Sequence, residues 1–290
     1  MLSQVTLEGE KELDYKIKEA QSIVNKVVKL SGDTPIVINF SGGKDSLTLA
    51  DLVSKATSNY ILIFSETSID LPGVTDFARK SAEALGCELL TSTPDLHKGD
   101  FFNRIAKFRK FPTIRETWCN RDLKFRPANK LLRKLYGSRH FYKLNGVRKT
   151  ESARRNSMHV STKRLGYIIP DYNTSSDFMV FPILNWSSEN IRQYLKENSI
   201  RIPKNPLYEK FGVSGCYWCP FYQTSIYKKI LSECPCIYDK IIEWEEILQK
   251  PSVSGFVYLR DIKAEVTQPE IQVMPSCQLL ACNNLKEASR

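Results

Sequence analysis

The stretch from Pro35 to Thr48 constrains the fold of this chain more than any other part of it. It opens with an apolar, β-branched run over residues 36–40, which is typical of a strand buried on both faces of a parallel sheet. The sequence Ser-Gly-Gly-Lys-Asp-Ser follows over residues 41–46, and apolar residues then recur at helical spacing. A strand, a glycine turn and a helix N-terminus present unpaired N–H groups and a favourable dipole to an anion. The stretch therefore predicts a phosphate-binding loop in an α/β protein with a parallel sheet.

This loop differs from two common nucleotide-binding patterns. A Walker loop needs a glycine five residues before Gly-Lys-Ser/Thr, whereas Asp45 follows Lys44 here and the earlier glycine is absent. The Rossmann Gly-x-Gly-x-x-Gly is absent as well. The simpler alternative is an ordinary strand–turn–helix connection with a tight glycine turn.

Polar and charged residues follow two of the other predicted strands. Residues directly after parallel strands lie where open α/β sheets bind ligands. Glu66 and Thr67 follow the second strand, and Arg148, Glu151 and Arg155 follow the fourth. The two arginines could neutralise a polyphosphate because guanidinium offers forked donors, and the glutamate could orient an arginine or help to hold Mg²⁺. Strands are predicted at residues 36–40, 60–64, 87–90, 141–145 and 179–184.

The segment from Phe101 to Arg139 mixes lysines and arginines with aromatic residues. Basic side chains among ring faces suit phosphate contact combined with base stacking. An amphipathic helix with a charged outer face explains the same pattern equally well. The segment leaves nucleic-acid binding and simple core packing as open alternatives.

The second half of the chain carries a Cys-x-x-Cys motif at Cys216 and Cys219, followed by Cys234 and Cys236. Two thiolates at this spacing can bind one metal ion. In a reducing compartment, where disulfides are rare, the motif therefore indicates metal ligands. The only histidines are His97, His140 and His159, none of them near, so an all-cysteine site is favoured. Zinc, and a thioredoxin-like redox pair, are the alternatives.

Length and composition fit a globular enzyme. The chain has 290 residues, 42% of them hydrophobic, and a net charge of +10 that suits a polyanionic partner or simply a solvated basic surface. No apolar run is long enough to span a bilayer, and the N-terminal residues lack a signal-peptide pattern, so we expect a cytoplasmic protein without membrane contact. The expected domains are an N-terminal helix over 1–30, a nucleotide-binding domain over 31–186 and a helical, cysteine-bearing region over 187–290. A homodimer is included among the expected partners.

Three blocks in order resemble the PAPS reductase family of the PP-loop ATP pyrophosphatase superfamily. They are Ser41 to Ser46, Cys119 to Pro127 with Leu123-Lys124, and Gly146-Val147-Arg148 with Glu151-Ser152 and Arg155. The family includes sulfonucleotide reductases, the small catalytic subunit of bacterial ATP sulfurylase and the DndC-like subunit of DNA phosphorothioation systems, the closest in type. The resemblance implies a doubly wound parallel sheet of the adenine nucleotide α-hydrolase-like type.

The resemblance also implies the site residues. Lys44, Asp45 and Arg148 would be catalytic. ATP, or another adenine nucleotide such as PAPS, would bind with Mg²⁺. A 4Fe–4S cluster would be held by Cys119, Cys216, Cys219 and, as the fourth ligand, Cys236 or Cys234. The expected nucleotide-binding residues are Ser41, Gly42, Gly43, Ser46, Glu66, Thr67, Lys124, Glu151 and Arg155.

Three functions follow from these expectations. In the first, the enzyme adenylates a substrate for sulfur transfer, with a cysteine desulfurase or another sulfur donor as a partner. In the second, it reduces a sulfonucleotide, with Cys277 or Cys282 in place of the absent C-terminal Glu-Cys-Gly motif. In the third, it is a nucleic-acid-binding partner, for DNA or tRNA, with a regulatory nucleotide site.

Overall fold

The computed structural model describes residues 2–94, 99–151, 155–156, 162–171, 174, 176–198 and 203–267, with side chains from residue 12 onward. The chain forms two compact units. Unit 1 contains residues 1–65, 75–92 and 128–205, and unit 2 contains residues 66–74, 93–127 and 206–290. The chain therefore passes between the units several times. The expected domain boundaries at residues 31 and 187 would instead divide the chain into three consecutive segments, and these boundaries stay a prediction.

Unit 1 contains a six-stranded sheet in the order β3-β2-β1-β4-β6-β5. Every neighbouring pair of strands is parallel except β5 and β6. This confirms the predicted α/β class and its parallel sheet. The antiparallel edge strand β5 was not predicted, since a run of three residues is too short to show a strand period. The strands are β1 (Ile36–Asn39), β2 (Tyr60–Ser65), β3 (Glu88–Ser92), β4 (Tyr142–Asn145), β5 (Ile168–Pro170) and β6 (Phe178–Val180).

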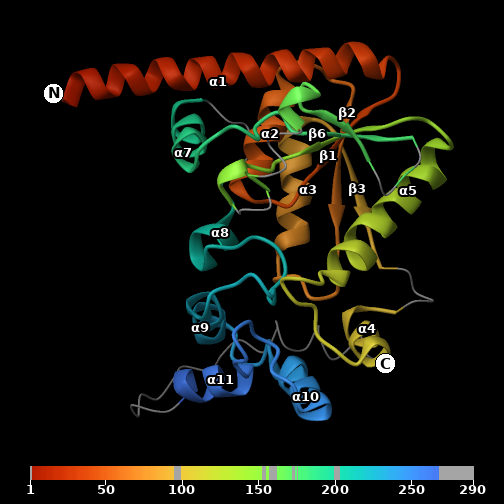
Figure 1. Ribbon diagram of the computed structural model, residues 1–290, viewed down its shortest axis with the longest axis vertical. Coiled ribbons are helices and arrows are strands. Elements are labelled where there is room, and N and C mark those ends of the chain that lie inside the picture. The colour runs from red at the N-terminus through yellow and green to blue at the C-terminus, as the bar shows by residue number, and fades with distance from the viewer. Residues whose placement is uncertain are drawn as a thin grey trace. The chain divides into compact units, whose positions relative to one another are not determined.

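Helices cover both faces of this sheet, as Figure 1 shows. Val37, Ile61 and Ile63 point to one face, where they form a buried cluster with Ala128 and Leu132 of α5. On the other side α1, α2 and α7 contact one another, and α1 and α2 also contact β1. The helices that belong mainly to unit 1 are α1 (Leu2–Ser31), α2 (Lys44–Ser54), α3 (Val74–Leu85), α5 (Arg126–Tyr136), α7 (Ser188–Glu197) and the 3₁₀ turn η2 (Lys149–Glu151).

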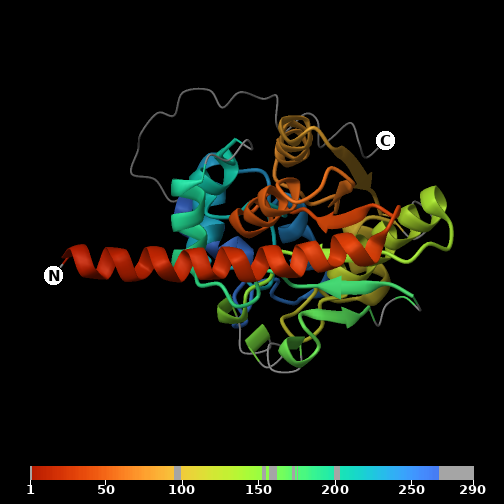
Figure 2. The ribbon, with the colours of Figure 1, turned by 90° about the horizontal axis from the view of Figure 1, so that it is seen from above.

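The N-terminal helix α1 was expected over residues 1–30; it extends from Leu2 to Ser31 and runs without a break, as Figure 2 shows. Its buried side chains recur at helical spacing and include Leu13, Ala20, Val24 and Val27. These residues form the face of α1 that packs in unit 1. Among the described residues, no helix combines the length and the apolar character that crossing a bilayer would require.

The order of the strands sets the position of the nucleotide site. β1 lies between β2 and β4, so the chain leaves the sheet in opposite directions after β1 and after β4. The side chains at the ends of these two strands meet, because the Asn39 amide donates to Asn145 Oδ1 at 2.8 Å. Ligands of open α/β sheets bind at such a switch point. The two predicted phosphate-binding blocks both begin here.

Unit 2 is helical and has its own hydrophobic core. Its elements are α4 (Phe101–Phe108), the π-helix η1 (Asn120–Phe125), α8 (Pro206–Phe211), α9 (Thr224–Glu233), α10 (Asp239–Leu248) and α11 (Leu259–Thr267). The rings of Phe101, Phe102, Phe111 and Trp118 are buried in this core. These rings of the basic, aromatic segment are therefore closed to base stacking, and the core-packing alternative describes them better.

Candidate functional site

The loop from Ser41 to Ser46 connects β1 to α2 in unit 1. Gly42 has φ +72°, and a Cβ atom there would lie 3.1 Å from Asn205 Nδ2 and 3.2 Å from the Phe77 ring. Asn205 also donates to the Gly42 carbonyl at 2.9 Å, a contact that no sequence pattern announced. Gly43 precedes α2 and makes no side-chain cap. The amides at the start of α2 can therefore serve an anion rather than a capping oxygen.

The two serine hydroxyls of the loop lie 3.2 Å apart and brace it from within. Ser46 Oγ donates to the Gly43 carbonyl at 2.9 Å and accepts from the Ser41 amide at 3.3 Å. These contacts hold the backbone in a tight turn before any ligand binds. We therefore expect Ser41 and Ser46 to shape the loop as well as to contact phosphate.

The predicted catalytic residues converge at the start of α2. Arg148 Nε lies 2.7 Å from Asp45 Oδ1, and Lys44 Nζ lies 2.9 Å from Asp45 Oδ2. The Arg148 guanidinium is buried and also donates to the hydroxyls of Thr150 at 3.1 Å and Ser188 at 3.0 Å. One carboxylate thus lies between two cations beside the uncapped helix end.

Glu151 and Arg155 join the same group of charges. Glu151 Oε2 accepts from the Arg148 amide at 2.9 Å and forms an ion pair with Arg155. The predicted role of Glu151 in orienting an arginine is therefore chemically possible at this position. Its role in holding Mg²⁺, and the phosphate contact of Arg155, stay predictions.

Gly146 matters for a reason that sequence reasoning missed. A Cβ atom at this position would lie 2.9 Å from the Asp45 carbonyl carbon and 2.9 Å from the Ser46 amide nitrogen. A Cβ atom does not approach backbone atoms so closely, so only glycine lets the segment after β4 pack against the phosphate loop. The glycine directly after a strand was the only signal in the sequence.

The second candidate site lies in unit 2, where three cysteines from distant segments come together. Cys119 precedes η1, while Cys216 and Cys219 lie in a loop whose backbone pairs with residues 69–71. The Tyr217 amide donates to the Ile69 carbonyl at 2.8 Å, and the Leu71 amide donates to the Gly215 carbonyl at 2.9 Å. This short antiparallel pairing fixes the position of Cys216.

These three thiols interact electrostatically with one another and with Lys124. Burial raises the pKa of Cys119 to about 12, and the charges of Cys216 and Cys219 add to the rise. Burial, with a smaller contribution from Cys216, raises the pKa of Cys219 to about 11. The pKa of the Lys124 ammonium is raised in turn, first by Cys216. Three thiols and one lysine therefore share a partly buried space.

The donor set suits a sulfur-ligated group but is incomplete. Among the described residues, no three His, Cys, Asp or Glu side chains are close enough to hold a single metal ion. A cluster differs in that it distributes its cysteine ligands over several iron atoms. Cys236 is exposed, and Cys234 is half-buried. The identity of a fourth ligand stays a prediction.

The residues after β2 also belong to unit 2. The Thr67 hydroxyl donates to Asp70 Oδ1 at 2.8 Å and lies 3.3 Å from Cys216 Sγ. Burial raises the pKa of the Asp70 carboxyl, and the charge of Glu66 adds a small contribution. Thr67 was expected to contact a nucleotide. Its hydroxyl instead has its described partners at the cysteine site, and nucleotide contact by Glu66 and Thr67 stays a prediction.

Two curated proteins of Methanocaldococcus jannaschii are similar to the chain. MJ0973 is 28% identical over 236 residues, which are 80% of this chain and 53% of that protein. MJ0066 is 28% identical over 221 residues, which are 74% of this chain and 42% of that protein. Both are described as uncharacterised. The chain thus spans about half the length of these relatives.

Three solved structures resemble the chain at low sequence identity. Phosphoadenylyl-sulfate reductase from Candida auris, in a phosphate complex, is 21% identical with a TM-score of 0.46 and covers 69% of this chain and 90% of its own. The U34-tRNA thiolase NcsA from Methanococcus maripaludis, with its [4Fe–4S] cluster, is 16% identical with a TM-score of 0.49, covering 92% and 87%. FMN adenylyltransferase from Candida glabrata, with FAD and pyrophosphate, is 17% identical with a TM-score of 0.46, covering 69% and 60%.

The model of one protein family matches the chain directly, and that family is described as the phosphoadenosine phosphosulfate reductase domain. The match runs from residue 35 to residue 222. It begins just before β1 and ends just after Cys219, so it takes in the phosphate loop, the block around Arg148 and the three converging cysteines. Because this match extends over more than half of the sequence, the chain belongs to the phosphoadenosine phosphosulfate reductase domain family.

Proposed function

We propose that the chain is a PP-loop enzyme that uses ATP to adenylate a substrate and so prepares it for sulfur transfer, as DndC-like proteins of the family do. Members of the family are enzymes, and adenine nucleotide binding is expected for them. One observation carries the proposal: Asp45, Lys44 and Arg148 meet beside an uncapped helix N-terminus at the switch point of the sheet. That arrangement offers donors and positive charge where a leaving diphosphate would accumulate negative charge.

The proposed reaction transfers the adenylyl group. An oxygen atom of the substrate attacks the α phosphorus of ATP, the bond from that phosphorus to the bridging oxygen breaks, and pyrophosphate leaves with the electron pair. The amides at the start of α2, together with Lys44 and Arg148, would stabilise the charge on the departing oxygen. A sulfur nucleophile from a donor protein would then displace AMP from the adenylated substrate. Mg²⁺ would neutralise the phosphates when bound.

The cysteine site would serve the sulfur step. Cys119, Cys216 and Cys219 would hold a 4Fe–4S cluster, with Cys236 or Cys234 as the predicted fourth ligand. When bound, such a cluster would either deliver the sulfur atom or supply electrons. Lys124 would balance the negative charge of the thiolates around it, because its ammonium interacts with all three.

The test is pyrophosphate and AMP release from ATP by anaerobically purified full-length protein, with cellular RNA, DNA and small-metabolite pools as acceptors and inorganic sulfide as the sulfur nucleophile that displaces AMP. We expect the two products in equal amounts and only with one acceptor pool. Asp45→Asn should abolish the release. Asp76→Asn, which changes an exposed acid paired with Arg79, should leave it unchanged. Release of ADP and phosphate instead, or equal activity of the Asp45→Asn variant, would contradict the proposal.

The principal alternative is reduction of a sulfonucleotide. Its candidate nucleophiles, Cys277 and Cys282, lie outside the described residues. Sulfite release from PAPS with a thiol reductant, lost in Cys277→Ser or Cys282→Ser, would favour this alternative over adenylation.

A further inference from the structure

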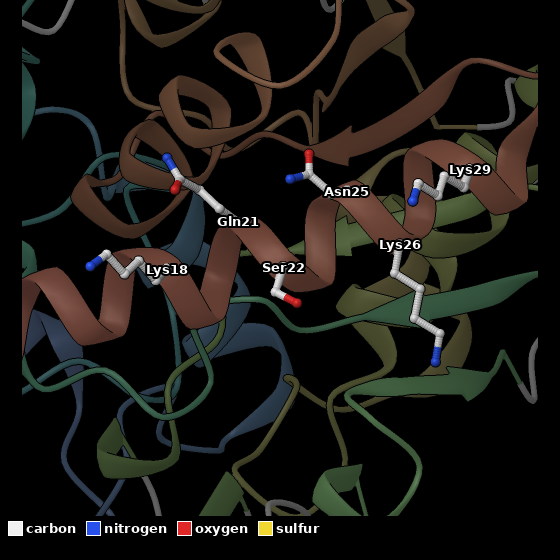
Figure 3. A pocket seen from close by; sticks show the side chains of 6 residues that line it. All are labelled: Lys18, Gln21, Ser22, Asn25, Lys26 and Lys29. Atoms are coloured by element: carbon white, nitrogen blue, oxygen red, sulfur yellow. The ribbon is translucent and has the colours of Figure 1, made fainter.

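The outer face of α1 carries a continuous polar strip. Its residues line a shallow hollow of about 500 Å³ and are shown in Figure 3: Lys18, Gln21, Ser22, Asn25, Lys26 and Lys29. Their spacing of three, four and seven residues places them along one side of the helix. The buried residues of α1, such as Val24 and Val27, pack on its other side. The strip is therefore free of a role in the core of unit 1.

The charge of this strip has one sign. All three lysines are exposed, and no carboxylate lines the hollow. The acid next to Lys18 in the sequence, Glu19, is hydrogen bonded to Tyr167. The amide and hydroxyl side chains between the lysines are the other groups that commonly contact phosphate oxygens. From Lys18 to Lys29 the helix rises about 16 Å, long enough for several successive phosphates of a strand.

A second hollow begins where the lysine strip ends. It measures about 760 Å³, and Leu30 and Ser31, which follow Lys29, line it together with Arg139 and His140. The Tyr142 and Phe178 rings also line it, stacked on each other with centroids 5.1 Å apart and planes 13° apart. Both rings are half-buried, so part of each remains accessible. Exposed ring faces beside basic groups suit the stacking of a nucleobase.

We infer that α1 and the hollow at its C-terminal end form a nucleic-acid-binding surface. The ammonium groups of Lys18, Lys26 and Lys29 contact the phosphates of one strand, and an unpaired base lies against the Tyr142 and Phe178 rings. The net charge of +10 fits a polyanionic partner, and in the segment around Phe101 the rings of Phe101, Phe102, Phe111 and Trp118 are buried in the core of unit 2. The inference concerns binding and is independent of whether ATP is cleaved.

The test is fluorescence anisotropy with full-length protein and labelled oligonucleotides of about 20 bases, one RNA and one single-stranded DNA, at several salt concentrations. We expect binding that weakens with salt. The triple variant Lys18→Gln, Lys26→Gln, Lys29→Gln should raise Kd at least tenfold and reduce the slope of log Kd against log salt by about two. The matched control is Lys80→Gln, Lys134→Gln, Lys196→Gln, which removes the same charge from exposed positions on other helices and should change Kd less than twofold.

A second arm tests the stacking hollow. Tyr142→Leu and Phe178→Leu, each confirmed as folded by its thermal transition, should weaken binding to single strands about tenfold and to a duplex hardly at all. Tighter binding to the RNA or to the DNA oligonucleotide would show which of the two nucleic acids the surface prefers. Equal binding would mean that the surface recognises only the phosphates and the base, which RNA and DNA share. Absence of salt-dependent binding by the unchanged protein, or equal losses in the α1 and control triples, would overturn the inference. Either result leaves pyrophosphate release, measured separately, as the test of adenylation.

Discussion

Arg148 and Asp45 are 103 residues apart in the sequence, yet their side chains form an ion pair with Nε and Oδ1 at 2.7 Å and Nη2 and Oδ2 at 3.5 Å. Two hydrogen bonds from one guanidinium to one carboxylate fix the orientation of both groups. The pair joins the phosphate loop after β1 to the segment after β4. It therefore holds the two halves of the candidate phosphate site together even without ligand.

This pair predicts an ordering of Arg148 variants. Arg148→Lys keeps the charge but loses the fork, and Arg148→Gln loses both. Charge-assisted hydrogen bonds contribute about 1.5–3 kcal/mol, so we expect kcat/KM for pyrophosphate release to fall roughly 10- to 100-fold in Arg148→Gln, and less in Arg148→Lys. Steady-state assays over a range of ATP concentrations would measure this. Arg79→Gln, at an exposed pair, is the control. Arg148→Gln with unchanged kcat/KM would show that the pair has no part in turnover.

The cysteine site predicts which thiols are required for iron. Cys119→Ser, Cys216→Ser and Cys219→Ser should each lose most of the iron and the visible absorbance of the anaerobically prepared protein, because each removes one of the three proposed cluster ligands. Cys87→Ser, in unit 1, should lose neither. Iron analysis and the absorbance spectrum are the measurements.

The same measurements decide the fourth ligand. Loss of iron in Cys236→Ser but not in Cys234→Ser would identify Cys236 as the fourth ligand. The reverse result would identify Cys234. Full iron content in both variants would mean that the three converging thiols suffice. Iron that survives in all three of the principal serine variants would rule out a cluster at this site.

Thr67 predicts a more subtle effect on the same site. Its hydroxyl lies 3.3 Å from Cys216 Sγ and is itself held by Asp70. Groups that hydrogen bond to metal ligands typically change metal affinity 10- to 100-fold. We expect Thr67→Val to lose iron to a chelator about 10-fold faster than the unchanged protein, whereas Thr67→Ser, which keeps the hydroxyl, should resemble it. If Thr67→Val lost iron no faster than Thr67→Ser, the Thr67 hydroxyl would have no role at the thiols.

Much of the site could be predicted because its groups are close in sequence. Ser41 to Ser46 form a local motif whose geometry follows from a strand, two glycines and a helix. The pairing of Arg148 with Asp45, and the approach of Gly146 to Asp45 and Ser46, depend on the strand order, which no local pattern encodes.

The aromatic segment was ambiguous for a related reason. A helix with one apolar face looks the same in sequence whether that face packs inward or binds a ligand, so only the tertiary structure shows that Phe101 and Trp118 are buried. The lysine strip of α1 was overlooked because charged residues on a helix surface are ordinary. It becomes informative once the packed face of α1 is known.

A buried charge network in the sheet should make stability depend on pH. Asp177 Oδ2 lies 2.7 Å from Lys143 Nζ, and Asp177 also forms an ion pair with Arg133. Lys143 lies 3.0 Å from Asp171 as well. Burial by itself would raise the pKa of the Asp177 carboxyl, but the hydrogen bond and charge of Lys143 hold this pKa below its ordinary value. The network therefore favours the ionised carboxylate in the folded protein.

The sign of the effect follows from that lowered pKa. The unfolded carboxyl titrates near 3.9, so the stabilisation is complete above about pH 5 and is lost as the pH falls through the lower folded-state pKa. Asp177→Asn should reduce the free energy of unfolding by about 2 kcal/mol at neutral pH, because it removes the carboxylate that pairs with Arg133 and leaves Lys143 with Asp171 alone. Urea unfolding between about pH 7 and pH 3 should show this difference shrinking as the carboxyl of the unchanged protein is protonated. Asp76→Asn, at an exposed pair, should change the free energy by less than about 0.5 kcal/mol throughout. A difference for Asp177→Asn that stays constant across this range would mean that lost packing, and not the charge of Asp177, accounts for the destabilisation.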